Sequence, residues 1–338
     1  MNWPAASGTF AFGDLVLHSG AILPDARLSW KTHGTLSPAR DNVVLYPTSY
    51  GAQHPDLEWL IGPDGVLDPG RWFVVIPDMF GNGLSSSPSN TPGWPGLVTA
   101  WDNVHAQRRL LSELWGIGRL HAVYGWSMGA QQAYHWAALF PDAVARAIVV
   151  CGSARTAVHN RVFLKGQMAV LEAAPEHRGD GRFVAQPDAA LRAFGRIYAG
   201  WALSQDFYRA NLHETALGAP DLDTFLRTDW EERFARRDAG DLHAQLRTWD
   251  AGDIASDARY GGDLAKALGA ITARVLLMPG ETDLYFRVAD NAAELPHLHR
   301  AELRPIPSLW GHRAGNPSVI PADAAFLKQA VRGWLDAD

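Results

Sequence analysis

The chain has 338 residues, of which 47% are apolar and 20% are charged, and its net charge is −6. This length is enough to bury a sizeable core, and the ordinary charged fraction excludes an intrinsically disordered chain. The basic residues form no stripe that favours nucleic acid as a partner, and no apolar run reaches the roughly 18 residues that would predict a membrane span.

Cysteine usage and the start of the chain bear on the compartment. Cys151 is the only cysteine, which excludes an internal disulfide framework and a zinc site built from cysteines. The first residues lack a basic segment followed by an apolar one, so we expect no signal peptide. These features predict a cytoplasmic protein that contacts neither nucleic acid nor membrane.

Short apolar runs alternate with helical patterns along much of the chain. Five such runs, each about as long as a strand and nearly continuous in apolar character, occupy residues 42–46, 72–76, 120–124, 147–151 and 273–278. Residues 102–114 and 131–140 between them are typical of helices. Strands of this kind are buried on both faces, and their alternation with helices predicts a doubly wound α/β fold with a mostly parallel sheet.

One long segment interrupts this alternation. Residues 154–268 contain no convincing buried strand, and residues 163–172, 189–202 and 242–249 are typical of helices. We therefore expect a core formed by residues 1–153 and 269–338, with residues 154–268 inserted as a helical cap.

The strongest local signal for chemistry is the pattern Gly125-Trp126-Ser127-Met128-Gly129. It follows a predicted strand directly and begins a predicted helix, as a nucleophilic serine on a sharp turn requires. Small residues on either side allow the backbone to crowd, and the start of a helix favours negative charge nearby. The pattern predicts Ser127 as a nucleophile, although a tight turn with an ordinary serine is the alternative.

A serine hydroxyl needs a base, and the base needs an acid to orient it. Asp283 follows the last predicted strand, where open α/β sheets place their sites, and His312 lies in a glycine-flanked loop before the final helix. Their chain order, serine then acid then histidine, is the one this architecture uses. Glu281 is the rival acid, and Asp290 is a weaker one.

A tetrahedral intermediate also needs two donors for its oxyanion. One should be the backbone N–H of Met128, which follows the nucleophile. The other should come from the loop after the first predicted strand, where we assign the backbone N–H of Ser49, with Thr48 and Tyr50 as alternatives.

Further residues are candidates for lining the expected site. Trp126 and Trp310 flank the nucleophile and the base, so they could shape a narrow apolar pocket as well as pack, and Tyr50 is a further candidate. No metal-binding or phosphate-binding motif occurs, and the Gly81-Asn82-Gly83 loop lacks the third glycine of a dinucleotide fingerprint. We expect no metal and no bound cofactor.

Several of these segments together resemble the homoserine O-acetyltransferase family of α/β-hydrolases. The resemblance rests on residues 58–68, 71–75, 125–133, 140–142 and 280–286, and it covers most of the chain. It implies the α/β-hydrolase fold, a Ser-His-Asp triad, an acyl-enzyme and often a homodimer paired through the cap.

The departures from that family bear on the reaction. Trp126 and Arg313 stand where the transferases usually have glycine and aspartate. Arg196 is not clearly in register with their substrate-carboxylate arginine, but it is a further candidate for lining the pocket. Residues 152–156, 199–201 and 307–312 instead resemble a related branch that hydrolyses short-chain esters.

The sequence thus leads to three hypotheses. The first is a serine hydrolase of small acetate-like esters. The second is an O-acyltransferase that uses acetyl-CoA as a co-substrate with homoserine or another alcohol; an arginine able to reach a substrate carboxylate would favour it. The third is a binding protein with little turnover, because fold alone does not fix function.

Overall fold

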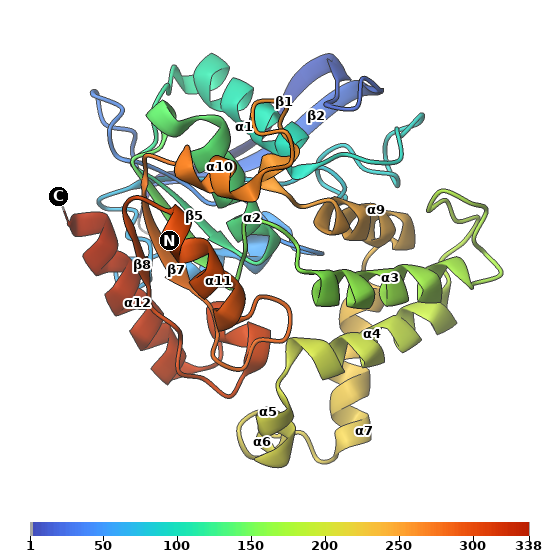
Figure 1. Ribbon diagram of the computed structural model, residues 1–338. Coiled ribbons are helices and arrows are strands. Elements are labelled where there is room, and N and C mark those ends of the chain that lie inside the picture. The colour runs from blue at the N-terminus through green and yellow to red at the C-terminus, as the bar shows by residue number, and fades with distance from the viewer. Residues whose placement is uncertain (1–2, 338) are drawn as a thin grey trace.

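The structure is a computed structural model that describes residues 3–337. Its centre is an eight-stranded sheet in the order β1-β2-β4-β3-β5-β6-β7-β8 (Figure 1). The strands are β1 (Ala5–Val16), β2 (Ile22–His33), β3 (Val43–Leu45), β4 (Phe73–Pro77), β5 (Ala122–Trp126), β6 (Arg146–Val150), β7 (Arg274–Met278) and β8 (Ala301–Leu303). Strands β3 to β7 match the five predicted runs, and all pairs from β4 through β8 are parallel.

Three strands were not predicted. The long hairpin of β1 and β2 pairs antiparallel, as do β2 and β4, and most of β1 is exposed. Its polarity is mixed because it lies at the sheet edge, so it lacks the continuous apolar character of a central strand. Strand β8 has only three residues, all partly buried, and gives too short a signal.

Alternate residues of the central strands contact opposite layers of the core. Val43 and Leu45 pack with α1 (Ala100–Trp115), α2 (Met128–Leu139) and α10 (Leu264–Gly269). On the other face, Val44 and Tyr46 pack with α12 (Pro321–Asp336). Helix α11 (Val288–Glu294) follows β7. The sheet is covered on both sides, which confirms the predicted α/β fold.

The remaining helices form the inserted segment. They are α3 (Val158–Glu172), α4 (Asp188–Ala202), α5 (Gln205–Arg209), α6 (Leu212–Thr215), α7 (Leu222–Phe225), α8 (Glu232–Ala235) and α9 (Ala239–Asp250). Figure 1 shows α3 to α7 together at the lower right, away from the sheet. Aromatic side chains of this cap, such as Phe163 and Tyr198, pack against Tyr285 and Trp310, which lie in the loops after β7 and β8. The cap therefore covers the carboxyl ends of the strands.

Residues 254–268, which the sequence pattern assigned to the cap, contribute side chains to the core around the sheet. Ile254, Tyr260 and Ala267 pack in the same core cluster as the sheet, and the Tyr260 hydroxyl donates to the carbonyl of Ala138 in α2. This stretch contains short helices and turns but no strand. Its sequence pattern therefore resembles that of the cap, although it packs with the core.

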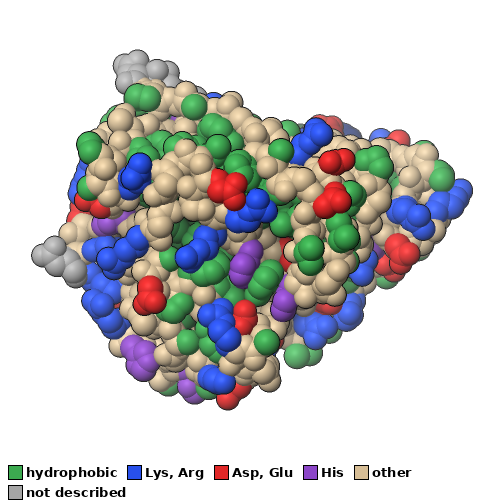
Figure 2. All heavy atoms as spheres, turned by 90° about the horizontal axis from the view of Figure 1, so that it is seen from above, with side chains coloured by type: hydrophobic (Ala, Val, Ile, Leu, Met, Phe, Trp, Pro, Cys, Tyr) green, Lys and Arg blue, Asp and Glu red, His purple; other side chains and the backbone are tan. Residues whose placement is uncertain are grey.

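The surface seen in Figure 2 carries Lys and Arg side chains interspersed with Asp and Glu. Among residues 3–337, no helix combines the length and apolar character needed to cross a bilayer.

Candidate active site

Ser127 lies on the sharp turn that joins β5 to α2. Its backbone has φ 58° and ψ −127°, a strained conformation for a residue with a side chain, and its N–H donates to the carbonyl of Val150 in β6. Such strain costs roughly 1–3 kcal/mol and is typical of functional sites. The turn directs the hydroxyl away from the sheet while the N-terminus of α2 lies directly behind it.

The two glycines of the pattern permit this turn. A Cβ atom at Gly125 would lie 2.1 Å from the carbonyl oxygen of Gly129, and one at Gly129 would lie 2.7 Å from that of Pro47. Backbone atoms cannot approach a side chain so closely. Strand β5, the start of α2 and the loop after β3 can therefore meet around Ser127 only because both positions lack a side chain.

His312 connects Ser127 to Asp283 through two hydrogen bonds. The distance from His312 Nε2 to Ser127 Oγ is 2.8 Å, and from His312 Nδ1 to Asp283 Oδ2 it is 2.7 Å. Because a carboxylate only accepts, Nδ1 carries the hydrogen and Nε2 accepts from the serine hydroxyl. All three side chains are buried, with at most 4% of each residue exposed. The arrangement can make the hydroxyl a nucleophile.

Local hydrogen bonds fix the two loops that carry Asp283 and His312. Asp283 Oδ1 accepts from the backbone N–H groups of Tyr285 and Phe286, while Thr282 Oγ1 accepts from Gly311 N and donates to the Ser308 carbonyl. Thr282 thus ties the loop of the acid to the loop of the histidine. Of the rival acids, Glu281 is exposed, and Asp290 accepts from the backbone N–H of Arg287 at the start of α11.

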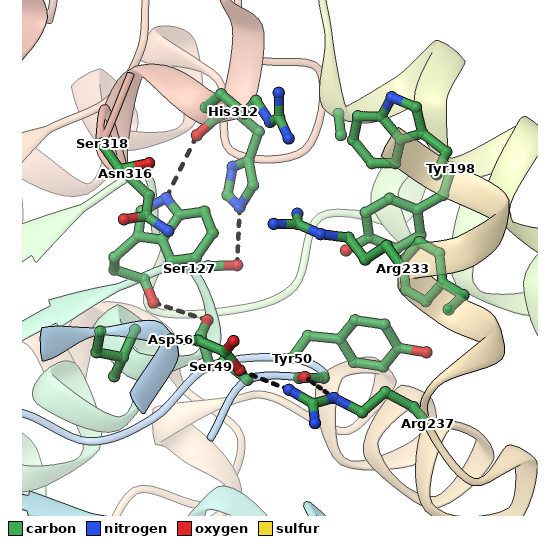
Figure 3. Close-up of a pocket in the computed structure, with 18 of the residues that line it drawn as sticks. Ser49, Tyr50, Asp56, Ser127, Tyr198, Arg233, Arg237, His312, Asn316 and Ser318 are labelled. Atoms are coloured by element: carbon green, nitrogen blue, oxygen red, sulfur yellow. Dashed lines mark hydrogen bonds and ion pairs between the residues drawn. The ribbon is translucent and has the colours of Figure 1, made fainter. Parts of the chain in front are cut away.

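The backbone groups predicted to donate to an oxyanion lie beside Ser127. Within residues 3–337, the backbone N–H groups of Met128 and Ser49 donate to no other group, whereas the Thr48 N–H donates to the Pro77 carbonyl. Ser49 Oγ donates to the carbonyl of Trp126, which holds the loop after β3 against the turn (Figure 3). Ser49 and Tyr50 therefore keep a free N–H, and Thr48 does not.

A cavity of about 150 Å³ opens beside Ser127 and His312, between the core and the cap. Tyr50 and Trp126 line it, as predicted; the Tyr50 ring stacks on Tyr198, and the Trp126 ring stacks on His312. Its lining also includes Ser49, Asp56, Trp230, Arg233, Phe234, Arg236, Arg237, Arg313, Asn316 and Ser318.

Two predicted pocket residues lie elsewhere. Arg196 is on the outer side of α4, where it pairs with Glu231 and Asp223 and is half exposed. Trp310 packs inside the cap, with its ring 4.9 Å from that of Phe207. The prediction that these two line the pocket was wrong, because α4 turns Arg196 away and the loop before His312 turns Trp310 into the cap.

Four arginines in the lining make the cavity basic, and sequence reasoning missed three of them. Burial lowers the pKa of Arg313 to about 10, helped by Arg233, and burial followed by Arg236 lowers the pKa of Arg233. The run Glu231–Arg237 has the pattern of a solvated charged helix, so nothing in it marks Arg233, Arg236 and Arg237. Arg313 was noticed only as a departure from the transferases.

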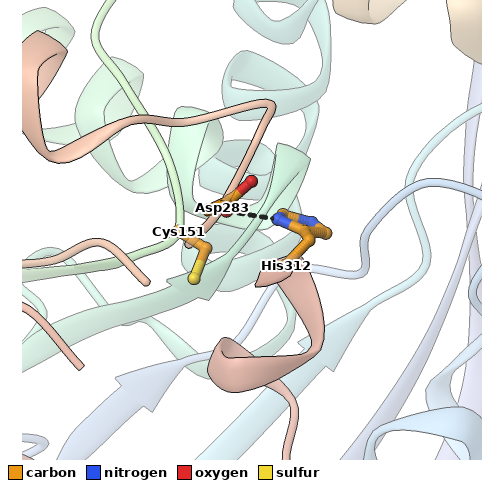
Figure 4. A group of neighbouring side chains, drawn as sticks. All are labelled: Cys151, Asp283 and His312. Atoms are coloured by element: carbon orange, nitrogen blue, oxygen red, sulfur yellow. Dashed lines mark hydrogen bonds and ion pairs between the residues drawn. The ribbon is translucent and has the colours of Figure 1, made fainter. Parts of the chain in front are cut away.

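Cys151 directly follows β6 and lies beside Asp283 and His312. Its Sγ is within 4.8 Å of ligand atoms of Asp283 and His312. In Figure 4 the sulfur points away from the Asp283–His312 hydrogen bond. Burial, followed by the charge of Asp283, raises the pKa of the thiol well above its usual value, which disfavours the thiolate that a metal would need.

Comparison with known proteins identifies the family of the fold. The sequence profile described as alpha/beta hydrolase fold matches residues 51–312. The chain is 36% identical to an ethyl acetate hydrolase of Pseudomonas veronii over 94% of this chain and 91% of that one. It is 30% identical to a homoserine O-acetyltransferase of Leifsonia xyli, over 87% and 80% of the two chains.

A solved structure extends the similarity to the whole fold. An acetylester hydrolase from Corynebacterium glutamicum superposes with a TM-score of 0.90 at 33% identity, covering 97% of this chain and 96% of the other. Together with the mostly parallel sheet and the turn that carries Ser127, these matches show that the chain belongs to the α/β-hydrolase fold family of enzymes.

Proposed function

We propose that the protein is a serine ester hydrolase that cleaves short-chain, acetate-like esters through an acyl-enzyme. The observation that carries the proposal is the unbroken chain of hydrogen bonds from Asp283 through His312 to Ser127, which ends at a cavity beside two free backbone N–H groups. The similarity to an ethyl acetate hydrolase and to an acetylester hydrolase supports the same reaction.

The first half of the reaction assigns a role to each of these residues. Ser127 Oγ attacks the ester carbonyl while His312 Nε2 takes its proton. The backbone N–H groups of Met128 and Ser49 donate to the oxyanion that forms. His312 then gives the proton to the leaving alcohol, and Asp283 holds the imidazole in the tautomer that both transfers require. An acyl-Ser127 ester and a free alcohol result.

Water completes the cycle. It attacks the acyl-Ser127 carbonyl, His312 accepts its proton, and the same proton returns to Ser127 Oγ as the acid leaves. The small cavity and the aromatic side chains of Tyr50, Tyr198 and Phe234 favour a short acyl group.

The acyltransferase alternative shares the first half-reaction, and two observations favour keeping it. One relative is a homoserine O-acetyltransferase, and arginines line the cavity. Homoserine, however, also carries an ammonium group, which needs an acidic partner. Asp56 is the one acidic residue in the described lining, and Arg237 already pairs with it. We therefore assign water as the acceptor.

Comparing acyl transfer to water with acyl transfer to homoserine tests this assignment. The protein is incubated with ethyl acetate in water, and separately with acetyl-CoA with and without homoserine. We expect acetate release from the ester and no homoserine-dependent release of CoA, with both rates compared to Ser127→Ala. Rapid CoA release that depends on homoserine would overturn the hydrolase proposal.

We also propose a cytoplasmic homodimer paired through the cap. Cys151 as sole cysteine suits a reducing compartment. Val158 and Val162, one turn apart on α3, are 78% and 62% exposed, and Ile197 on α4 is 43% exposed. Such apolar exposure favours an interface. Light scattering of Val162→Asp against the parent protein tests it, since a dimer should dissociate and a monomer should not change.

A further inference from the structure

Two of the cavity arginines have no acidic partner. In the described part of the chain, neither Arg233 nor Arg313 forms an ion pair, although Asp229 acts on both from a distance. The Arg313 guanidinium lies over the ring of Trp230 at 5.2 Å, and Arg233, which is exposed, lines the same cavity. Guanidinium groups held in a narrow cavity without a counter-charge are typical of an anion-binding site.

The other two arginines are already engaged. Arg237 donates to the Gly51 carbonyl and Gln53 Oε1 and pairs with Asp56, and Arg236 reaches the same carboxylate at 3.5 Å. The positive charge left for a ligand therefore belongs to Arg233 and Arg313.

The fold presents these two side chains from opposite sides of the cavity. Arg233 is on α8, directly after the π-helical stretch Leu226–Glu231 that also carries Trp230. Figure 3 shows its guanidinium extending from the cap toward Ser127 and His312. Arg313 follows His312 in the chain. A π-helical stretch changes the direction of the following side chains, and such stretches are frequent at functional sites.

The reaction itself decides which part of the substrate meets the arginines. His312 must protonate the leaving oxygen, so the alcohol part of the ester lies beside His312, whereas the carbonyl oxygen lies beside Met128 and Ser49. We infer that Arg233 and Arg313 bind a carboxylate carried by the alcohol part, so that the preferred substrates are short-chain acyl esters of hydroxy acids. This inference rests on the proposed function.

A matched pair of substrates tests the preference. Acetoxyacetate and acetoxyacetamide have the same size and differ in charge, and each rate is divided by its uncatalysed hydrolysis rate. We expect kcat/KM for the carboxylate to exceed that for the amide by at least about tenfold, as a charge-assisted hydrogen bond gives. Equal values, or a preference for the amide, would overturn the inference.

Variants locate the preference. Arg233→Gln and Arg313→Gln should each lower the carboxylate-to-amide ratio by about tenfold. Arg209→Gln is the control, because Arg209 is an exposed arginine of the cap outside the cavity, and it should keep the parent ratio. Thermal melting of each variant checks that it is folded. If both cavity variants kept the carboxylate-to-amide ratio of the parent protein, the assignment of the two arginines would be contradicted.

Binding to Ser127→Ala separates this inference from the proposed function. Calorimetric titration should show that glycolate binds at least about tenfold more tightly than glycolamide, and that Arg233→Gln in the same background removes the difference. If glycolate binds selectively but no ester is hydrolysed, the arginine site stands and the hydrolase proposal fails. If the esters are hydrolysed but glycolate binds no more tightly than glycolamide, the hydrolase proposal stands and the arginine site fails.

Discussion

Replacing Gly125 by alanine tests how the backbone positions Ser127. The added Cβ would lie 2.1 Å from the Gly129 carbonyl oxygen, and real Cβ atoms do not approach closer than 3.0 Å. Strand β5 and helix α2 must therefore separate by about 0.9 Å, the difference between those two distances. Misplacement of about 1 Å costs on the order of 100-fold in rate, and overpacking costs about 1–3 kcal/mol of stability.

The assay is hydrolysis of p-nitrophenyl acetate, with urea unfolding for stability. Gly118→Ala is the matched control, because a Cβ there meets nothing within 4 Å, and it should change the free energy of unfolding by less than about 0.5 kcal/mol. Normal activity and stability of Gly125→Ala would refute the claim that close backbone contact at this glycine sets the position of Ser127.

Three other predictions concern polar side chains. Asp283→Asn should lower kcat for ester hydrolysis by about 10³–10⁴-fold, because the wrong tautomer of His312 is then held, with little change in the melting temperature; a loss below tenfold would contradict the role of the acid. Burial raises the pKa of Glu294 to about 7, so the folded protein holds a proton that the unfolded chain releases, and stability should fall by roughly 3 kcal/mol as the pH rises from 4.5 to 7. Buried histidines such as His135 act in the opposite direction over this range, so the test is the difference between two proteins: in urea unfolding, the free energy of unfolding of the parent should fall by about this amount relative to that of Glu294→Gln. Arg237→Gln loses its bonds to the 51–56 loop and should lower the free energy of unfolding by about 1–3 kcal/mol, whereas the more exposed Arg236→Gln should lower it by less than about 1 kcal/mol; equal effects would contradict the difference in their contacts.

The sequence was sufficient for the central strands and for the set of Ser127, His312 and Asp283. Buried parallel strands leave a continuous apolar pattern, and the glycine spacing with the order of Ser127, Asp283 and His312 reflects a backbone geometry that few other residues allow. The edge hairpin was missed because exposed strands have mixed polarity. Residues 254–268 contain no strand, so their sequence pattern resembled that of the cap, but several of their side chains pack against the core around the sheet.

The cavity wall was beyond sequence reasoning for a different reason. Whether Arg196 or Arg233 faces Ser127 depends on how α4 and α8 turn relative to the sheet, and both lie in charged helical patterns that look alike. Tertiary packing alone separates an arginine paired with Glu231 on the outside from one that faces the cavity without a partner.

Stoichiometric labelling with a reactive phosphonate, read by peptide mass mapping, tests most directly whether this hydroxyl carries the acyl group. A single adduct on Ser127, lost in Ser127→Ala together with ester hydrolysis and formed far more slowly in His312→Ala, is the predicted result. An adduct on another residue, or hydrolysis that persists in Ser127→Ala, would contradict it.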